Sequence, residues 1–405
     1  MKVLILNSVI GEETSTGKHI RDISEYLLQK GEEVLVFYSQ KSKIANTPTY
    51  AKKFGYNLEN KLHALLSRLT GKQGYYSYVG TKSLIRIIEK EKPDIVHLHN
   101  LHSNDICFPT LFKFFKKRKI KTIINLHDCW YYTGRCYHYT KLNCMQWKDG
   151  CKKCPGKCRS GPYWLFKRTK SLSRDKRRFF GLNDLRVVGV SKWIAEEAKR
   201  SQILGDKKIS FIYNWIDMDI FSPRVDASFW AQYGVSDKKI VLGVCGRWVE
   251  DKGLSDLLGL SNKLGNNEQL VLIGNVDSSI QEAYKDKILF LPPIYNKKNL
   301  AQAYANADIY INLSREESFG LTNAEALACG TPIIVYDSTA SPEFVNGKCG
   351  CIARVGNLDD IVVGVATLSK LDREELRAEC REFAREHFDR EKNIEKYYQL
   401  YQELV

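Results

Sequence analysis

Two glutamates, Glu317 and Glu325, stand eight residues apart around a glycine turn, and an apolar segment of helical period follows the second one. In this arrangement Glu317 can face a reacting sugar from the loop, while backbone N–H groups at the start of the helix bind phosphate. Glu325, two turns into the helix, can accept hydrogen bonds from ribose hydroxyls. The alternative, a solvated helix face, is disfavoured because the residues after Glu325 are mostly apolar.

Two cations, Arg247 and Lys252, stand five residues apart in a turn that follows an apolar strand and opens a helix at about Gly253. Such a turn can hold a planar guanidinium and an ammonium over one diphosphate. The alternative is an ordinary exposed turn with two solvated charges.

The elements that must position these residues follow a βαβ rhythm, in which short apolar runs alternate with segments of helical period. The predicted strands are residues 3–6, 34–38, 94–99, 122–126 and 187–190, then 240–244, 270–273, 288–291, 309–313 and 332–336. Two such series predict an α/β fold with two parallel, doubly wound sheets, each covered by helices on both faces. Ligands of such sheets collect at the carboxyl ends of the strands, so we expect the chemistry in a cleft between two domains.

The predicted domains are residues 1–215 and 216–385, with a terminal helix over 386–405 that packs back on the first domain. A cysteine-rich insertion at about 129–158 interrupts the first domain. The joint is placed at residues 213–217, where one series of strands ends and a loop leads to the next.

Taken together, these motifs resemble the retaining glycosyltransferases of the GT-B fold known as family 4. The resemblance rests on the Glu317 and Glu325 pair, the Arg247 and Lys252 turn, the run Glu-Ala-Leu-Ala-Cys-Gly-Thr-Pro at 325–332, Ala307-Asp308 before a strand, and Asn-Trp-Ile-Asp at 214–217. The resemblance implies two Rossmann-like domains that face a cleft. It also implies transfer of a sugar from a nucleotide donor with retention of configuration, and a catalytic step that needs no metal.

The resemblance assigns roles to residues of the second domain. Arg247 and Lys252 neutralise the diphosphate leaving group, Glu317 lies beside the transferred sugar, and a UDP-sugar is favoured over a GDP-sugar. The remaining donor contacts fall on the base, the phosphates and the ribose: Pro293, Ile294, Phe319, Gly320, Leu321, Thr322 and Glu325.

In the first domain the resemblance points to His127 and Gly17. His127 follows the strand at 122–126, where the family keeps a histidine that contacts the donor sugar; the alternative is a purely structural histidine. The family also has a glycine loop after the first strand, and here the segment 11–18 carries Gly17, with Thr16, as the matching position.

Positive charge is confined to one half of the chain. Residues 1–200 contain 39 Lys and Arg against 17 Asp and Glu, a net charge of +22, whereas residues 201–405 contain 23 against 30, a net charge of −7. This asymmetry predicts an anionic partner for the first half. Nucleic acid is disfavoured because no recognised nucleic-acid module is present and the 317–332 motif would stay unexplained.

Six cysteines fall between positions 129 and 158, and four of them are spaced as possible zinc ligands: Cys136, Cys144, Cys151 and Cys154. The last two form a Cys-x-x-Cys pair of the kind common in tetrahedral zinc sites. The alternatives are reduced packing cysteines, or redox or disulfide chemistry. The segment 127–136 also resembles that of family members acting in bacterial capsule, colanic-acid-like or O-antigen assembly.

Aromatic and basic residues alternate at 163–180 and again at 113–119. This pattern is typical of a surface that inserts aromatics among headgroups while cations meet anionic lipid; the alternative is helices that pack their aromatics inward. No apolar run spans a bilayer and the N-terminus does not read as a signal peptide. We therefore expect a cytoplasmic enzyme, peripheral at the inner face of the membrane, with a lipid-linked oligosaccharide acceptor.

Overall fold

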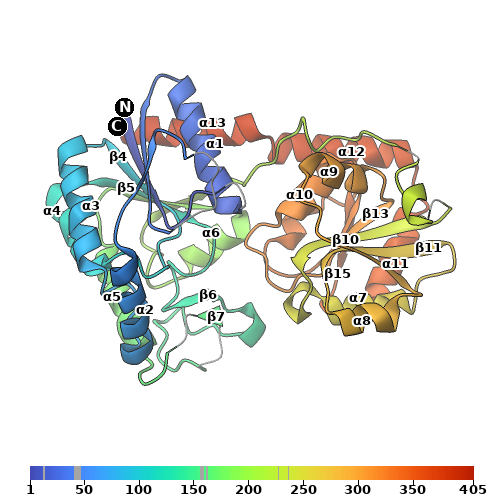
Figure 1. The fold of residues 1–405 in the computed structure, drawn as a ribbon, viewed down its shortest axis with the longest axis horizontal. Coiled ribbons are helices and arrows are strands. Elements are labelled where there is room, and N and C mark those ends of the chain that lie inside the picture. Colours follow the sequence, from blue (N-terminus) through green and yellow to red (C-terminus); the bar gives the residue numbers. More distant parts are fainter. Residues whose placement is uncertain (12–13, 41–46, 156–158, 161–162, 227, 236) are drawn as a thin grey trace. The chain divides into compact units, whose positions relative to one another are not determined.

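The computed structural model describes residues 1–11, 14–40, 47–155, 159–160, 163–226, 228–235 and 237–405. It divides into two compact units, of which the first comprises Met1–Ile212 with Ile394–Val405 and the second Tyr213–Asn393 (Figure 1). The boundary lies three residues before the predicted one. Trp215 and Ile216 are buried in the second unit, where the Ile216 N–H donates to the Phe388 carbonyl at 3.1 Å.

The first unit is built on a seven-stranded sheet whose order is β3-β2-β1-β4-β5-β8-β9 and whose pairings are all parallel. The strands are β1 (Lys2–Asn7), β2 (Glu33–Tyr38), β3 (Ala51–Lys53), β4 (Ile95–Leu98), β5 (Lys121–Leu126), β8 (Leu185–Gly189) and β9 (Lys208–Phe211). The central strands are apolar runs buried on both faces, as parallel sheets require. The strand order reverses between β1 and β4, which is therefore the topological switch point.

Helices cover this sheet on both faces (Figure 1). They are α1 (Ser15–Gln29), α2 (Asn57–Thr70), α3 (Tyr78–Glu91), α4 (Phe108–Arg118), α5 (Thr169–Phe179), α6 (Lys192–Lys199) and most of α13 (Arg390–Leu404). A short antiparallel pair, β6 (Cys136–His138) with β7 (Arg159–Ser160), lies in the cysteine-rich insertion.

The C-terminal helix α13 packs on the first unit through buried tyrosines. Tyr401 shares a hydrogen bond of 2.8 Å with Nδ1 of His97, and the Tyr397 hydroxyl donates to Asn125 Oδ1 at 2.6 Å. The predicted helix 386–405 is not one element, because residues 386–387 still belong to α12 (Arg373–His387). The return of the chain to the first unit therefore begins with α13.

The second unit is built on a six-stranded parallel sheet of order β12-β11-β10-β13-β14-β15. The strands are β10 (Lys239–Arg247), β11 (Glu268–Asn275), β12 (Ile288–Leu291), β13 (Ile309–Asn312), β14 (Ile333–Tyr336) and β15 (Gly350–Ala353). Here the order reverses between β10 and β13, so the switch point lies between the strands that precede the two predicted motifs.

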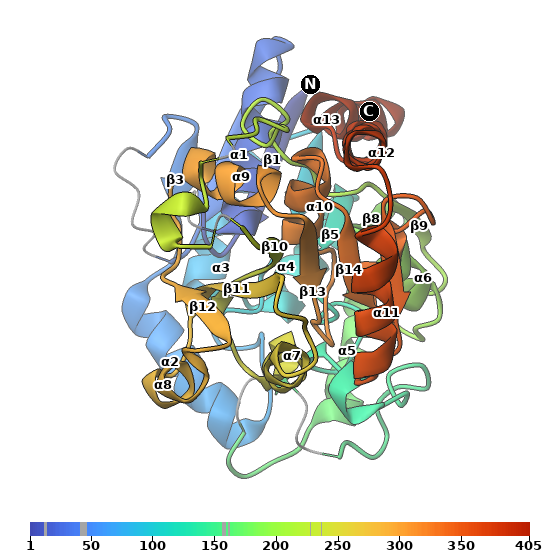
Figure 2. The same ribbon diagram turned by 90° about the vertical axis from the view of Figure 1, so that its right-hand side faces the viewer.

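Two layers of helices enclose the second sheet. One layer holds α9 (Lys297–Ala305), α10 (Leu321–Ala328) and α12; the other holds α7 (Leu254–Ser261), α8 (Ser278–Tyr284) and α11 (Leu358–Leu368) (Figure 2). Both units therefore have the predicted doubly wound α/β architecture. Within the described residues, no helix combines the length and the apolar character needed to cross a bilayer.

Candidate functional site

In the second unit, the predicted donor-binding residues gather at the carboxyl edge of the sheet. Arg247 ends β10, Lys252 ends the short 3-10 helix η3 (Glu250–Lys252), and Glu317 lies in the loop that follows β13. Since β10 and β13 flank the switch point, their loops diverge there and leave room for a ligand.

The structure joins Lys252 and Glu317 across this switch point. The Lys252 ammonium lies 2.5 Å from Glu317 Oε1 and donates to the Ser314 hydroxyl at 3.2 Å. The Glu317 backbone N–H in turn donates to Thr339 Oγ1 at 2.9 Å. Both charged side chains are half-buried, so each keeps an open side toward solvent. The pair is a preorganised cation and carboxylate at the carboxyl edge of the sheet.

Two glycines allow the backbone turns that carry this pair. Gly253 has φ +75°, and a Cβ there would lie 2.4 Å from the Leu313 carbonyl oxygen, so Lys252 is held close to the end of β13. Gly320 has φ +111° and is the N-cap of α10. Only glycine adopts both conformations without strain.

Helix α10 presents its N-terminus and Glu325 to the same edge. The amides of Leu321 and Thr322 in its first turn have no acceptor within the helix, which favours an anion at this end. Glu325 is half-buried and accepts a 3.1 Å hydrogen bond from the Tyr304 hydroxyl. Burial first, and then the Glu325 carboxylate, raise the pKa of Tyr304 far above its usual value, so Tyr304 remains a donor.

Arg247 differs from Lys252 in being exposed and unpaired with acid. Its backbone is held by pairing with Asn275 on β11, and no carboxylate of the described residues lies within 4 Å of its guanidinium. It is thus available to a phosphate. Pro293 and Ile294 follow β12 at the same edge and are half-buried. Phe319, by contrast, is buried and packs edge to face on Phe344 at 5.0 Å, so its side chain belongs to the core.

In the first unit, the carboxyl edge holds several histidines beside one carboxylate, Asp128. His127, just after β5, stacks on His99 at 5.2 Å, and its Nε2 lies 2.9 Å from His99 Nδ1 and 3.0 Å from Asn125 Nδ2. Because the Asn125 carbonyl oxygen accepts from Tyr397, the Asn125 amide nitrogen faces His127 and donates to Nε2. The proton of the neutral His127 ring therefore lies on Nδ1.

Burial keeps these histidines neutral. It lowers the pKa of His127 to about 4 and that of His97 to about 3, and it lowers the pKa of His19 and His99 far below the usual value. His19, His99 and His127 bring three ring nitrogens within 4.8 Å of one another, and they form the one set of potential metal ligands among the described residues. Beside these neutral rings, Asp128 carries the negative charge of the edge, because its contact with His102 Nε2 at 2.8 Å helps to keep the pKa of this carboxyl low.

Gly17 does not offer its amide to a ligand. Its N–H donates at 3.1 Å to Thr14 Oγ1, which caps α1, and a Cβ at Gly17 would lie 2.2 Å from the Gly11 carbonyl oxygen. A glycine is required here because the loop backbone crosses closely; the assignment of Gly17 to the donor site stays a prediction. Thr16 is exposed in the first turn of α1, and residues 12–13 of this loop lie outside the described residues.

The zinc site predicted from four cysteines is not formed in the described part of the chain. No three of Cys136, Cys144, Cys151 and Cys154 come within 4.8 Å of one another. Cys151 instead accepts from the Gly134 amide at 3.3 Å, and burial raises the pKa of its thiol to about 11. Cys158 lies outside the described residues. The buried, protonated thiol of Cys151 fits the packing alternative.

Only part of the predicted aromatic and basic surface is exposed. Phe112 and Phe115 of α4, together with Phe180, are buried and cluster through ring contacts, which is the alternative interpretation of these segments. Trp164, Leu165 and Phe166 are exposed, as predicted. The two cases were indistinguishable from composition because both place Phe beside Lys and Arg.

Sequence reasoning missed the residues that support the charged pair and the histidines. Ser314, Thr339 and Tyr304 are common polar residues that only the fold brings to the site. His97 and His99 offered a signal, since two histidines at period two share one face of a strand.

Comparison with known proteins defines the class. Solved structures of the same fold include sucrose-phosphate synthase from Thermosynechococcus elongatus, with a TM-score of 0.71, 16% identity, and coverage of 100% of this chain and 98% of that one. They also include the Anabaena protein HepE in complex with UDP, with a TM-score of 0.69, 13% identity, and full coverage of both chains. The fold is therefore that of the GT-B glycosyltransferases.

Family models cover both units. The model described as Glycosyltransferase Family 4 matches residues 16–220, and that described as Glycosyl transferases group 1 matches residues 228–387. The chain belongs to glycosyltransferase family 4.

Curated relatives differ in their named reactions. The N-acetyl-alpha-D-glucosaminyl L-malate synthase of Bacillus anthracis is 29% identical over 241 residues, 56% of this chain and 62% of that protein. The putative colanic acid biosynthesis glycosyl transferase WcaC of Escherichia coli is 24% identical over 332 residues, 77% of each chain. A D-inositol 3-phosphate glycosyltransferase of Mycobacteroides abscessus is 31% identical over 138 residues, which are 31% of this chain and 31% of that protein. The chain therefore spans less than two thirds of the length of the Bacillus anthracis and Mycobacteroides relatives.

Proposed function

We propose that this protein transfers a sugar, with retention of configuration, from a UDP-sugar to a lipid-linked glycan. The observation that carries the proposal is the contact between Lys252 and Glu317 at the switch point of the second sheet. A cation fixed beside a carboxylate, with the N-terminus of α10 adjacent, is suited to a leaving diphosphate and a departing sugar.

In the proposed step, the bond between the anomeric carbon and the diphosphate oxygen breaks while the acceptor oxygen bonds to the same face of that carbon. The leaving phosphate takes the acceptor's proton. Lys252 and Arg247 stabilise the charge that develops on the phosphate, so the protein itself supplies the positive charge of the step. Glu317 lies beside the sugar, and Glu325 accepts hydrogen bonds from the ribose.

The backbone at Pro293 and Ile294 meets the base, and UDP as the donor nucleotide is supported by HepE, whose structure contains it. His127 presents Nδ1–H to a sugar hydroxyl. This role is supported by the neutral ring and by its Nε2 contacts to His99 and Asn125.

A lipid-linked acceptor in surface polysaccharide assembly is supported by two relatives. One is WcaC, named for colanic acid biosynthesis; the other is a Klebsiella pneumoniae protein of a cps region, 23% identical over 78% of this chain and 81% of that one. We place the enzyme at the inner face of the cytoplasmic membrane. The +22 charge of residues 1–200 and the exposed segment at 164–166 support that location.

A soluble acceptor is the second candidate, because the Bacillus anthracis relative is named for a malate product and the Mycobacteroides relative for inositol phosphate. Purified protein, UDP-sugars and either a lipid-linked or a soluble acceptor distinguish the two. We expect UDP release that depends on the lipid-linked acceptor and a product of unchanged anomeric configuration by NMR. Inversion, or release with soluble acceptors alone, contradicts the proposal.

A further inference from the structure

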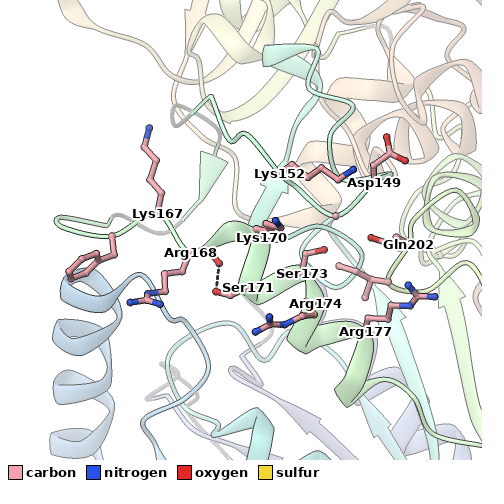
Figure 3. Close-up of a pocket in the computed structure, with 13 residues that line it drawn as sticks. Asp149, Lys152, Lys167, Arg168, Lys170, Ser171, Ser173, Arg174, Arg177 and Gln202 are labelled. Carbon is pink, nitrogen blue, oxygen red and sulfur yellow. Dashed lines mark hydrogen bonds between the residues drawn. The ribbon is translucent and has the colours of Figure 1, made fainter.

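A cavity of about 740 Å³ lies within the first unit beside α5, and none of the histidines described above lines it (Figure 3). Its volume is in the range of small-molecule sites. Lys170, Ser171, Arg174 and Arg177 come from α5, and the loop that carries Asp149 and Lys152 lies across from them. The other lining residues are Gly150, Phe166, Lys167, Arg168, Ser173, Gln202 and Ile203.

The cavity is strongly and unevenly charged. Six of its lining residues are cationic and one, Asp149, is acidic. Among the described residues, no carboxylate lies within 4 Å of the side-chain nitrogens of Lys152, Lys170 or Arg177, and Arg174 reaches only its neighbour Asp175, at 3.5 Å. Converging cations without nearby counter-charges raise the local concentration of an anion.

The cations of α5 lie on two faces of the helix, one buried and one exposed. Lys176 points inward, where its ammonium contacts the Trp130 and Thr133 carbonyls and lies 3.3 Å from the centre of the Trp130 ring. Lys170, Arg174 and Arg177 lie on the opposite, exposed face and line the cavity. The structural role of Lys176 therefore leaves the outer cations unused by the fold.

Exposed apolar side chains adjoin the cavity. Trp164, Leu165 and Phe166 are 58%, 67% and 52% exposed, and Phe166 itself lines the cavity. This segment is fixed to the end of α2, because the Trp164 N–H donates to the Arg68 carbonyl at 2.7 Å. On α2, Leu58 and Leu62 are 81% and 53% exposed. Apolar groups next to clustered cations match a ligand with an anionic head and an apolar tail.

We propose that this cavity binds the diphosphate of a lipid-linked acceptor, with the apolar segment at 164–166 receiving the start of the lipid chain. The arginines offer planar forks, the lysines point charges and Ser171 a hydroxyl to the phosphate oxygens. The inference rests on the proposed function, because it names the part of the acceptor that the first unit recognises.

Titration calorimetry with farnesyl diphosphate tests the site in the full chain. We expect K170Q/R177Q to weaken its binding at least tenfold. The matched control K116Q/K117Q, which removes two exposed cations of α4, changes it less than twofold. K252A retains the binding, which separates this cavity from the donor site. Equal affinity of K170Q/R177Q and the wild type, or loss in K252A, overturns the proposal.

Two further ligands identify the source of the diphosphate. Inorganic pyrophosphate is expected to bind at least tenfold more weakly than farnesyl diphosphate; equal affinity overturns the lipid assignment. If short duplex DNA displaces farnesyl diphosphate at a lower concentration than pyrophosphate does, the lipid assignment is overturned and nucleic acid is the ligand. Glycosylation by the wild type is a separate readout of the proposed function. If the wild type glycosylates no lipid-linked acceptor while K170Q/R177Q still weakens farnesyl diphosphate binding, the proposed function fails but the cavity remains a binding site for a lipid diphosphate.

Discussion

The two units place contrasting chemistry at equivalent edges of similar sheets. In the second unit, which lies in the acidic half of the chain, the switch point carries the Lys252 and Glu317 pair and the unpaired Arg247. In the first unit, which holds most of the excess positive charge, the corresponding edge carries His99 and His127, both held neutral by burial. The net charge of each half of the chain therefore does not predict the charged groups at its sheet edge.

The contrast shows that net charge describes the outer surface of a domain, whereas site chemistry depends on a few residues at strand ends. The cations of the first unit are mostly exposed, as on α4 and α5, where they face solvent or the cavity beside α5. A diphosphate leaving group needs fixed cations, while sugar hydroxyls can be bound by neutral imidazoles as well as by carboxylates. The two edges fit these two demands.

The largest expected effect is on the charged edge. Lys252→Ala removes the cation nearest to Glu317, and we expect turnover to fall roughly 10²- to 10³-fold, the range for loss of one preorganised donor to a developing charge. Glu317→Gln should reduce turnover similarly. UDP release in the presence of acceptor measures both, with circular dichroism to confirm folding.

Lys263→Ala is the matched control, because Lys263 belongs to the same unit and pairs with exposed Asp359 at 2.9 Å. Its turnover should stay within twofold of wild type. If K252A kept more than half of the wild-type turnover, the charged edge would not be the site of the reaction.

The second prediction concerns the backbone turn at Gly253, which holds Lys252 close to the end of β13 and so beside Glu317. Gly253→Ala combines φ +75° with a Cβ 2.4 Å from the Leu313 carbonyl oxygen, so we expect a loss of about 2 kcal/mol in the free energy of unfolding. Gly234→Ala is the control, since Gly234 has φ +71° and no atom within 4 Å of an added Cβ. Urea denaturation should show the larger loss for Gly253→Ala. Equal losses would mean that the close approach to β13 contributes nothing.

Arg247 tests whether the exposed cation of the second unit binds donor. We expect Arg247→Ala to weaken UDP binding about tenfold, equivalent to about 1.4 kcal/mol, because a charged hydrogen bond to phosphate is lost. Arg354→Ala, in the same unit, removes an exposed arginine that pairs with Asp360 at 2.7 Å, and it should leave UDP affinity unchanged. Titration calorimetry measures the affinity of the wild type, Arg247→Ala and Arg354→Ala for UDP. Equal UDP affinity in all three proteins would show that Arg247 does not bind the donor.

The last prediction concerns the pH dependence of stability and the histidines, seven of which lie in the first unit and one in the second. Burial lowers the pKa of His63 to about 4, where its Nε2 accepts from the Gly74 amide at 3.0 Å. The unfolded chain takes up this proton near pH 6.5, so stability is lost as pH falls from about 6.5 to 4, and no further loss follows below that.

His63→Gln should therefore flatten the pH dependence of unfolding by up to one proton, about 1.4 kcal/mol per pH unit. Urea denaturation between pH 7 and 4.5 measures the slope, which is informative even where the variant is less stable. An unchanged slope in His63→Gln would show that this imidazole takes up its proton at the same pH in the folded and the unfolded protein.

Much of the fold was predictable because parallel strands are continuous apolar runs, as at β1, β10 and β14, and these runs need no partner to be recognised. The positions of Glu317, Arg247 and Lys252 after strands were equally readable. The close approach of the Gly11 carbonyl to Gly17 was not readable, because sequence does not display a contact between loop segments. The cysteine spacing likewise does not show whether the four thiols converge, so the zinc site stays a prediction.

Sequence by itself determined the two α/β series, the family and the residues that follow the strands, because local periodicity and short motifs encode them. Tertiary structure decided which of these residues meet. The strand order places β10 beside β13, and only this non-local pairing brings Lys252 to Glu317. It also decided that Phe115 packs inward while Trp164 stays exposed, because burial depends on neighbours distant in the chain.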